Sequence, residues 1–192
     1  MIEKALDDLE EGDWLLLQNE INDLKWIIDE GARRGARIAL NLAPVDSRIE
    51  SYPLAKLSLL IVNRVEAQSV AGRDQIGGAL ARSVSALLPE TVVLLTEGKE
   101  GSILIDPVSQ SATKTGSFEI DVVDETAAGD AFVGYFMAGL VENKDFTKSL
   151  IEASAAGALA VTRHGAATSI PARQNVEELM LNQSISQENL VP

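Results

Sequence analysis

The stretch LSLLIVN at residues 57–63 decides the fold class. It is a run of strand length with apolar side chains on both faces, and it ends at the polar residue Asn63. A strand of this kind is typical of a parallel sheet that helices cover on both sides. The run therefore predicts a buried strand with a polar loop directly after it.

Segments of the same kind recur on both sides of this run, and segments with helical periodicity separate them. We expect further strands at residues 14–18, 37–42, 91–96, 102–105 and, more briefly, 120–123. Helices are expected at residues 21–32, 79–88, 129–141, 145–161 and 173–181. Because strands that alternate with helices favour βαβ units, the sequence predicts an α/β fold with a mostly parallel sheet.

The length of the chain and its composition favour one globular domain. The chain has 192 residues, of which 46% are hydrophobic, and domains average about 150 residues. It has no internal repeat and no linker rich in Pro, Gly or Ser. We therefore expect one domain over residues 1–182, followed by a polar, frayed tail over residues 183–192.

The charge and the rare residue types exclude several classes of function. With 16 Lys and Arg against 29 Asp and Glu, the net charge is −13, which disfavours nucleic acid and anionic membrane surfaces as partners. No uninterrupted apolar window is long enough to span a bilayer, and the N-terminal residues are acidic. The absence of Cys and the single His argue against a disulfide scaffold, a cysteine nucleophile and a histidine-rich metal centre. We expect a soluble, cytoplasmic protein.

The polar turn DETAAGD at residues 124–130 is the strongest candidate for chemistry. In open parallel sheets, ligands bind in the loops that follow the strands. The small residues Ala127, Ala128 and Gly129 leave the backbone N–H groups at the start of the next helix open to an anion. Asp130 could take a proton from an attacking hydroxyl, and the alternative is that it only complements the helix dipole.

This turn resembles the D-T-x-(G/A)-A-G-D motif of the ribokinase, or PfkB-type, family of carbohydrate kinases. Residues 15–20, 40–44, 63–66, 96–101 and 160–166 also resemble ribokinase segments and occur in the family order. The resemblance covers about residues 14–179. It implies a three-layer α/β/α sandwich and an ATP-dependent sugar kinase that transfers the γ-phosphate of ATP to a sugar hydroxyl, with ribose favoured.

The resemblance assigns catalytic roles to the turn at residues 124–130. It implies that Asp130 is the catalytic base and contacts the sugar. It also implies that the amides of Ala127, Ala128 and Gly129 stabilise the transferring phosphoryl group, which suits a reaction that needs mainly positioning and charge stabilisation. Glu20 matches the acidic residue that contacts the sugar in ribokinases, and its alternative is an exposed carboxylate near a helix start.

Further residues match the nucleotide and metal sites of the family. Asn63 and Glu66 match an N-x-x-E motif tied to Mg²⁺ through the water molecules of the metal, and the alternative for Glu66 is a solvated carboxylate at a helix start. The residues implied to bind ATP are Asn63, Thr96, Gly98, Gly101, Gly129 and Ser154. Those that match a monovalent cation site, implied to hold K⁺, are Asp124, Thr126, Ala160, Arg163, Gly165 and Ser169. The alternative for this cation site is an ordinary contact between loops.

Two residues and the length depart from the family pattern. Glu125 stands where the motif usually has Thr, and Asn19 stands where an apolar residue is usual. The first strands of the family and its lid sheet have no counterpart here, so the sequence predicts a sugar kinase that is either a divergent short form or a truncated or split one. The alternatives are a non-catalytic nucleotide-binding module and a subunit that needs a separate lid-bearing chain. Assembly of the chain into a homo-oligomer is a further alternative.

Overall fold

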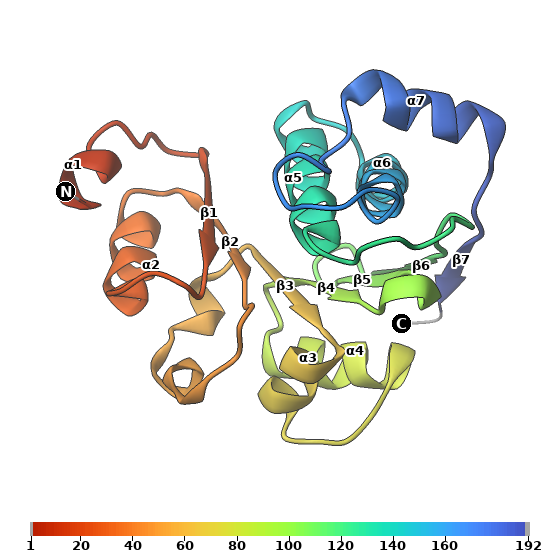
Figure 1. Ribbon diagram of the computed structural model, residues 1–192. Coiled ribbons are helices and arrows are strands. Elements are labelled where there is room, and N and C mark those ends of the chain that lie inside the picture. The colour runs from red at the N-terminus through yellow and green to blue at the C-terminus, as the bar shows by residue number, and fades with distance from the viewer. Residues whose placement is uncertain (1, 191–192) are drawn as a thin grey trace. The chain divides into compact units, whose positions relative to one another are not determined.

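The computed structural model describes residues 2–190 as strands and helices in alternation (Figure 1). The strands β1 (Trp14–Gln18), β2 (Arg37–Asn41), β3 (Leu59–Asn63) and β4 (Val92–Thr96) pair in parallel. The strands that continue the sheet in chain order are β5 (Ser102–Asp106), β6 (Ser111–Thr115) and β7 (Gln187–Leu190). The helices are α1 (Ile2–Leu6), α2 (Leu24–Arg33), α3 (Arg64–Ala71), α4 (Gly77–Leu87), α5 (Ala128–Val141), α6 (Phe146–Ala160) and α7 (Arg173–Asn182). The predicted α/β fold with a mostly parallel sheet is confirmed.

The described chain divides into two compact units with separate hydrophobic clusters. Unit 1 holds residues 2–97, 103–112 and 190, and unit 2 holds residues 98–102 and 113–189. The sequence predicts a single domain over residues 1–182, and this assignment of one domain stays a prediction.

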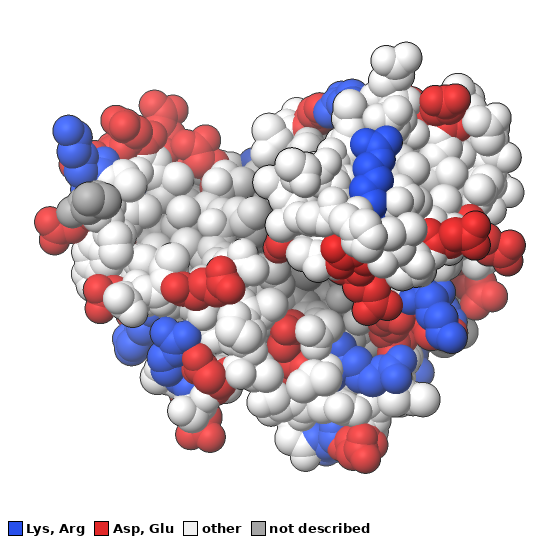
Figure 2. All heavy atoms as spheres, viewed as in Figure 1, with Lys and Arg blue, Asp and Glu red and all other residues white. Residues whose placement is uncertain are grey.

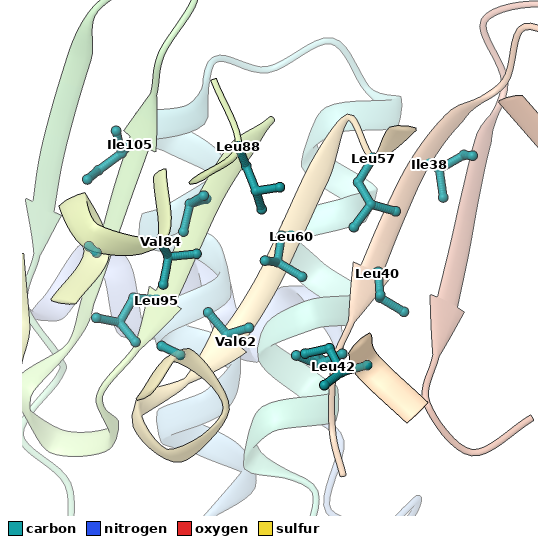
Figure 3. Packing of buried hydrophobic residues seen from close by; sticks show 14 of the residues in the cluster. Ile38, Leu40, Leu42, Leu57, Leu60, Val62, Val84, Leu88, Leu95 and Ile105 are labelled. Atoms are coloured by element: carbon teal, nitrogen blue, oxygen red, sulfur yellow. The ribbon is translucent and has the colours of Figure 1, made fainter. Parts of the chain in front are cut away.

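The core of unit 1 follows from the apolar runs of its strands. Along β3, Leu59, Leu60, Ile61 and Val62 are all buried, as the sequence predicts for a strand covered on both faces. Leu60 and Val62 share one face because side chains alternate along a strand, and they belong to one cluster with Val84 of α4 (Figure 3). Burial of a side chain of this kind contributes about 1.5–3 kcal/mol.

The core of unit 2 is built by the helices α5, α6 and α7. Its buried members are Phe118, Ala131, Ala155, Ala156, Ala160, Val176 and Leu179. Small side chains let α5 and α6 approach each other closely, because a Cβ atom at Gly139 would overlap with the side chain of Ser149. This pairing fixes the direction of α5, whose first turn carries residues 128–130 of the 124–130 segment.

Two expected elements differ in the structure. Residues 120–123 form no strand, because the amides of Val123 and Asp124 donate to the carbonyl of Val161 at the end of α6, at 2.8 and 3.1 Å. The segment after Asn182 is not frayed throughout, since residues 187–190 form β7. The amide of Gly116, next to β6, also donates to the carbonyl of Ser186 at 2.9 Å.

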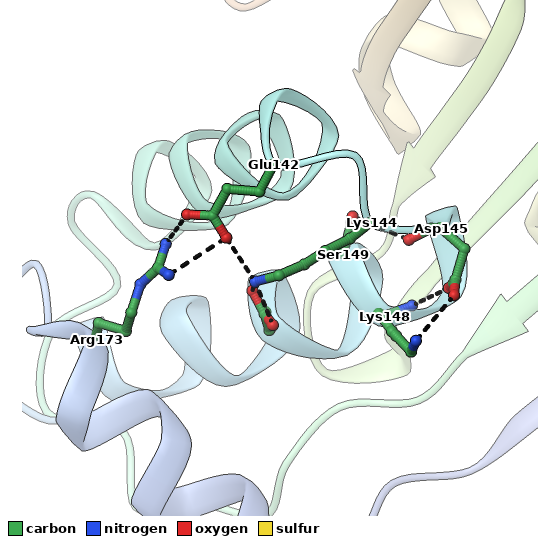
Figure 4. Close-up of polar contacts among 7 residues, drawn as sticks. Glu142, Lys144, Asp145, Lys148, Ser149 and Arg173 are labelled. Carbon is green, nitrogen blue, oxygen red and sulfur yellow. Dashed lines mark hydrogen bonds and ion pairs between the residues drawn. The ribbon is translucent and has the colours of Figure 1, made fainter.

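An ion-pair network joins the start of α7 and the end of α5 to the middle of α6 (Figure 4). Arg173 at the start of α7 pairs with Glu142 after α5. Lys144 pairs with the same carboxylate at 2.9 Å and with Glu152 of α6 at 2.7 Å. The hydrogen bonds from Arg173 and Lys144 lower the pKa of Glu142 to about 2.

This network predicts a specific acid sensitivity. The pKa of Glu142 lies below its ordinary value of 4.5 in the folded chain, so its contribution to stability is complete above pH 4.5 and is lost as the pH falls towards 2. We expect the difference in urea midpoint between the wild type and Glu142→Gln to be constant above pH 4.5 and to shrink between pH 4.5 and 2. A difference that is independent of pH in this window would show that the charge of Glu142 does not stabilise the fold.

Candidate functional site

The start of α5 in unit 2 is a candidate anion site, in which the amide of Ala128 also donates to the carbonyl of Glu125 at 3.3 Å. Ala127 has a left-handed backbone with φ of 63°, and no side chain caps the first turn. A Cβ atom at Gly129 would meet nothing within 4 Å, and Asp130 is exposed in the first turn. Helix starts of this kind present N–H groups and a positive dipole end to an anion. An exposed carboxylate therefore stands beside backbone groups that favour negative charge.

Asp124 joins the loop before α5 to the loop after α6. One carboxylate oxygen accepts from the hydroxyl of Thr126 at 2.6 Å and from its amide at 3.0 Å, and the other accepts from the amide of Gly165 at 3.1 Å. These three hydrogen bonds hold the pKa of Asp124 well below its usual range. His164 is 82% exposed and lies 3.7 Å from Asp124, as expected for a solvated loop residue.

The carboxylate of Asp124 links two other members of the predicted cation set. Among the described residues, it accepts hydrogen bonds from Thr126 and Gly165 and from none of Ala160, Arg163 and Ser169. Ala160 is buried in the core of unit 2, and Arg163 is exposed. Ser169 is buried, and its hydroxyl donates to the carbonyl of Ala166 at 2.8 Å. Ser154, one of the residues implied to bind ATP, is buried on α6.

The loop at residues 98–101 requires its glycines. Gly98 and Gly101 have φ of 58° and 88°, a region that favours glycine. A Cβ atom at Gly101 would overlap with the carbonyl oxygen of Thr115, so this position also needs the absence of a side chain. The hydroxyl of Ser117 donates to the carbonyl of Lys99 at 2.6 Å and helps to fix the loop.

In unit 1, Asn63 and Glu66 form a capping box at the start of α3. The side chain of Asn63 accepts from the amide of Glu66 at 3.0 Å, and both oxygens of Glu66 accept from Asn63, at 2.7 and 2.8 Å. Burial raises the pKa of Glu66, while the bonds from Asn63 lower it, and burial is the larger effect. Glu66 is only 3% exposed, so the alternative of a solvated carboxylate is wrong. Thr96 lies beside Asn63 in the register of β3 and β4.

Glu97 is a residue of unit 1 that the sequence analysis missed. Its side chain is 6% exposed and accepts from the amide of Gly77 at 3.2 Å and from Arg64 at 3.3 Å. It thus connects the end of β4 with the starts of α3 and α4. Glu97 stands between Thr96 and Gly98, and an acidic residue at this position of the sequence carries no signal of this role.

Glu20 is exposed directly after β1, whereas its neighbour Asn19 is fully buried. Asn19 is the second residue whose role was missed, since the sequence marked it only as a departure from the family pattern. The signal in the sequence was an Asn at a strand end where an apolar residue is usual, because a polar side chain buried at such a position must find partners.

Residues 2–190 contain neither a membrane-spanning helix nor a cluster of metal ligands. No helix in this range is long and apolar enough to cross a bilayer. No group of three or more His, Asp or Glu side chains in the same residues could hold a metal ion.

On the face drawn in Figure 2, Lys and Arg lie among Asp and Glu.

Comparison with known proteins places the chain in a family. The family model described as pfkB family carbohydrate kinase matches residues 32–173. The chain therefore belongs to the pfkB family of carbohydrate kinases.

The relatives within this family include several ribokinases. The chain is 28% identical to the ribokinase of Haemophilus influenzae, over 94% of this chain and 60% of that protein. It is 31% identical to the ribokinase of Bacillus subtilis, over 92% of this chain and 58% of that protein. The chain thus spans about 60% of the length of these two curated relatives.

Solved ribokinase structures share the fold. The crystal structure of Thermotoga maritima ribokinase superimposes with a TM-score of 0.78 at 31% identity, covering 94% of this chain and 62% of that one. Arabidopsis thaliana ribokinase, solved with ribose and ATP, gives a TM-score of 0.79 at 27% identity, covering 87% of this chain and 55% of that one.

Proposed function

We propose that this chain carries out ATP-dependent phosphorylation of a sugar hydroxyl, with ribose as the favoured sugar. The observation that carries the proposal is the uncapped start of α5, where Asp130 is exposed beside the backbone of residues 127–129. The ribokinase relatives, and the ribose and ATP bound in the Arabidopsis thaliana structure, support the choice of reactants.

The proposed reaction is one in-line phosphoryl transfer. The sugar hydroxyl gives its proton to the carboxylate of Asp130, and its oxygen forms a bond to the γ-phosphorus of ATP. The bond from this phosphorus to the bridging oxygen breaks, and ADP leaves with the electron pair. The amides of Ala127, Ala128 and Gly129 stabilise the charge on the transferring group.

The nucleotide is assigned to Thr96, Gly98, Gly101, Asn63, Gly129 and Ser154. Gly98 and Gly101 both have positive φ, and Gly98 fits this role because its open side, without a Cβ atom, lets the backbone approach phosphate closely. Glu20 is assigned to the sugar.

Mg²⁺ fits the pair Asn63 and Glu66. Both oxygens of the buried Glu66 carboxylate accept hydrogen bonds from Asn63, so contact through the water molecules of the metal suits the pair. Mg²⁺ usually keeps several water molecules and binds substrate phosphates with few carboxylates. When bound, the ion would neutralise phosphate charge.

K⁺ is assigned to the loops that Asp124 joins. The carboxylate holds Thr126 and Gly165 in one cluster, which is the kind of oxygen-rich loop contact that a monovalent cation would order. Backbone carbonyls near Ala160, Arg163 and Ser169 would complete the set.

The proposal predicts nucleotide binding that responds to sugar and to K⁺. In calorimetric titration we expect a non-hydrolysable ATP analogue with Mg²⁺ to bind one site, more tightly in KCl than in NaCl. Added D-ribose should give its own binding heat, whereas AMP, which lacks the β- and γ-phosphates, should bind more weakly.

Each departure from this result has a distinct meaning. Nucleotide binding without a ribose signal would favour the nucleotide-binding module or a chain that needs a partner. Equal affinity in the two salts would remove the K⁺ assignment. Absence of nucleotide binding would contradict the kinase proposal as a whole.

A further inference from the structure

Asn19 lies one residue beyond the last paired residues of β1 and β2, and it is fully buried. Its side-chain amide donates to the carbonyl of Pro44 at 2.6 Å, and its side-chain carbonyl accepts from the hydroxyl of Tyr52 at 2.7 Å. Both ends of the side chain therefore bind the segment at residues 43–52, which follows β2.

The backbone of Asn19 binds the same segment. Its amide donates to the carbonyl of Ala43 at 3.2 Å, and its carbonyl accepts from Arg48 at 3.0 Å. Arg48 is itself held by Asp46, whose carboxylate also caps the short helix at residues 47–51. Four hydrogen bonds thus converge on one residue.

These contacts restrict the residue that follows. The N–H and the C=O of Asn19 belong to the peptide groups on either side of the residue, and both are bonded, so the direction in which the chain leaves β1 is fixed. Glu20 is the next residue, and it is exposed at the carboxyl end of the parallel strands. This end of a parallel sheet is where ligands bind. Buried polar groups that are fully partnered specify one local geometry, because each unmade bond is costly.

We propose that Asn19 is a positioning residue that holds Glu20 and the segment at residues 43–52 in one geometry for sugar binding. Asn19 does not touch the sugar in this proposal. The sugar part of the inference rests on the proposed function, while the part about the segment does not.

The test uses three variants of the full chain. Asn19→Leu removes both side-chain bonds at similar volume, and Tyr52→Phe removes only one of them and disturbs folding least. Thr91→Val is the matched control. The buried hydroxyl of Thr91 donates to the carbonyl of Leu57 at 2.9 Å, so this variant also removes one buried hydrogen bond of unit 1, and it does so outside the segment at residues 43–52.

Two readouts are measured for each variant, amide hydrogen exchange and the Kd for D-ribose in the presence of the ATP analogue. For Asn19→Leu we expect exchange at residues 45–52 to accelerate and the Kd for ribose to rise about tenfold, with an unchanged Kd for the analogue. Tyr52→Phe should show a smaller change in the same direction. Thr91→Val should leave both the exchange at residues 45–52 and the Kd for ribose as in the wild type.

The outcomes separate the inference from the proposed function. If the wild type binds ribose and both Asn19→Leu and Tyr52→Phe bind it equally well, Asn19 does not position Glu20. If exchange at residues 45–52 is unchanged in both variants, the inference fails whatever the ribose result. If the wild type binds no ribose, the sugar proposal fails, and the exchange data alone decide whether Asn19 holds the segment.

Discussion

Replacing Asp130 with Asn is expected to lower the rate of phosphoryl transfer from ATP to ribose by about 10²–10⁴-fold, the usual contribution of a general base. Asn has nearly the same shape as Asp but cannot accept the proton of the attacking hydroxyl. Asp130 is exposed in the first turn of α5, so its replacement should leave the fold intact. Affinity for the ATP analogue should remain or rise slightly, because a negative charge near the phosphates is removed.

The measurement is the initial rate of ADP formation in the presence of ribose, with Asp121→Asn as the control. Asp121 is an exposed aspartate of the same unit, so its variant carries the same change of charge outside the helix start. We expect the rate of this control to equal that of the wild type. Equal rates for Asp130→Asn and the wild type would show that another group takes the proton or that none is needed.

The strands that could be predicted are those with uninterrupted apolar runs. β1 is found at residues 14–18 as expected, and β4 starts one residue later than expected, at Val92. β6 could not be recognised, because its sequence SATKT is polar and only Ala112 and Thr115 are buried. The polar strand β7 was missed for the same reason. Polar strands such as β6 and β7 form because they pair with a neighbouring strand, and the local sequence does not predict that pairing.

The candidate site was predictable in residue type but only partly in geometry. The N-x-x-E spacing is that of a capping box, so the bonds between Asn63 and Glu66 follow from sequence. The burial of Glu66 does not, since it depends on how neighbouring elements cover the helix start. The left-handed backbone of Ala127 is also unmarked in the sequence, because Ala seldom adopts it.

The catalytic proposal makes the packing of α5 important for function. The first turn of α5 carries the residues assigned to phosphoryl transfer, and the rest of the helix packs against α6. A loss of packing in the middle of α5 would therefore loosen the helix that directs these residues.

Phe136→Ala is expected to cause the largest loss of stability, about 3–5 kcal/mol. Phe136 is fully buried at the centre of α5. Its ring stacks on that of Phe132, with centroids 6.5 Å apart, and on that of Phe146 of α6, with centroids 6.3 Å apart. Removal of this ring leaves a cavity between the two helices, and the loss is a large part of the 5–15 kcal/mol that stabilises a typical domain.

The loss of stability in Phe136→Ala can be assigned to one unit, because each unit has its own readout. Both tryptophans, Trp14 and Trp26, lie in unit 1, so tryptophan fluorescence in urea follows that unit, whereas hydrogen exchange of α5 amides follows unit 2. We expect Phe136→Ala to accelerate exchange along α5. The control Val141→Ala, at a residue 63% exposed on the same helix, should change stability by less than about 0.5 kcal/mol. Similar exchange in the two variants would mean that the stacked rings do not hold α5 against α6.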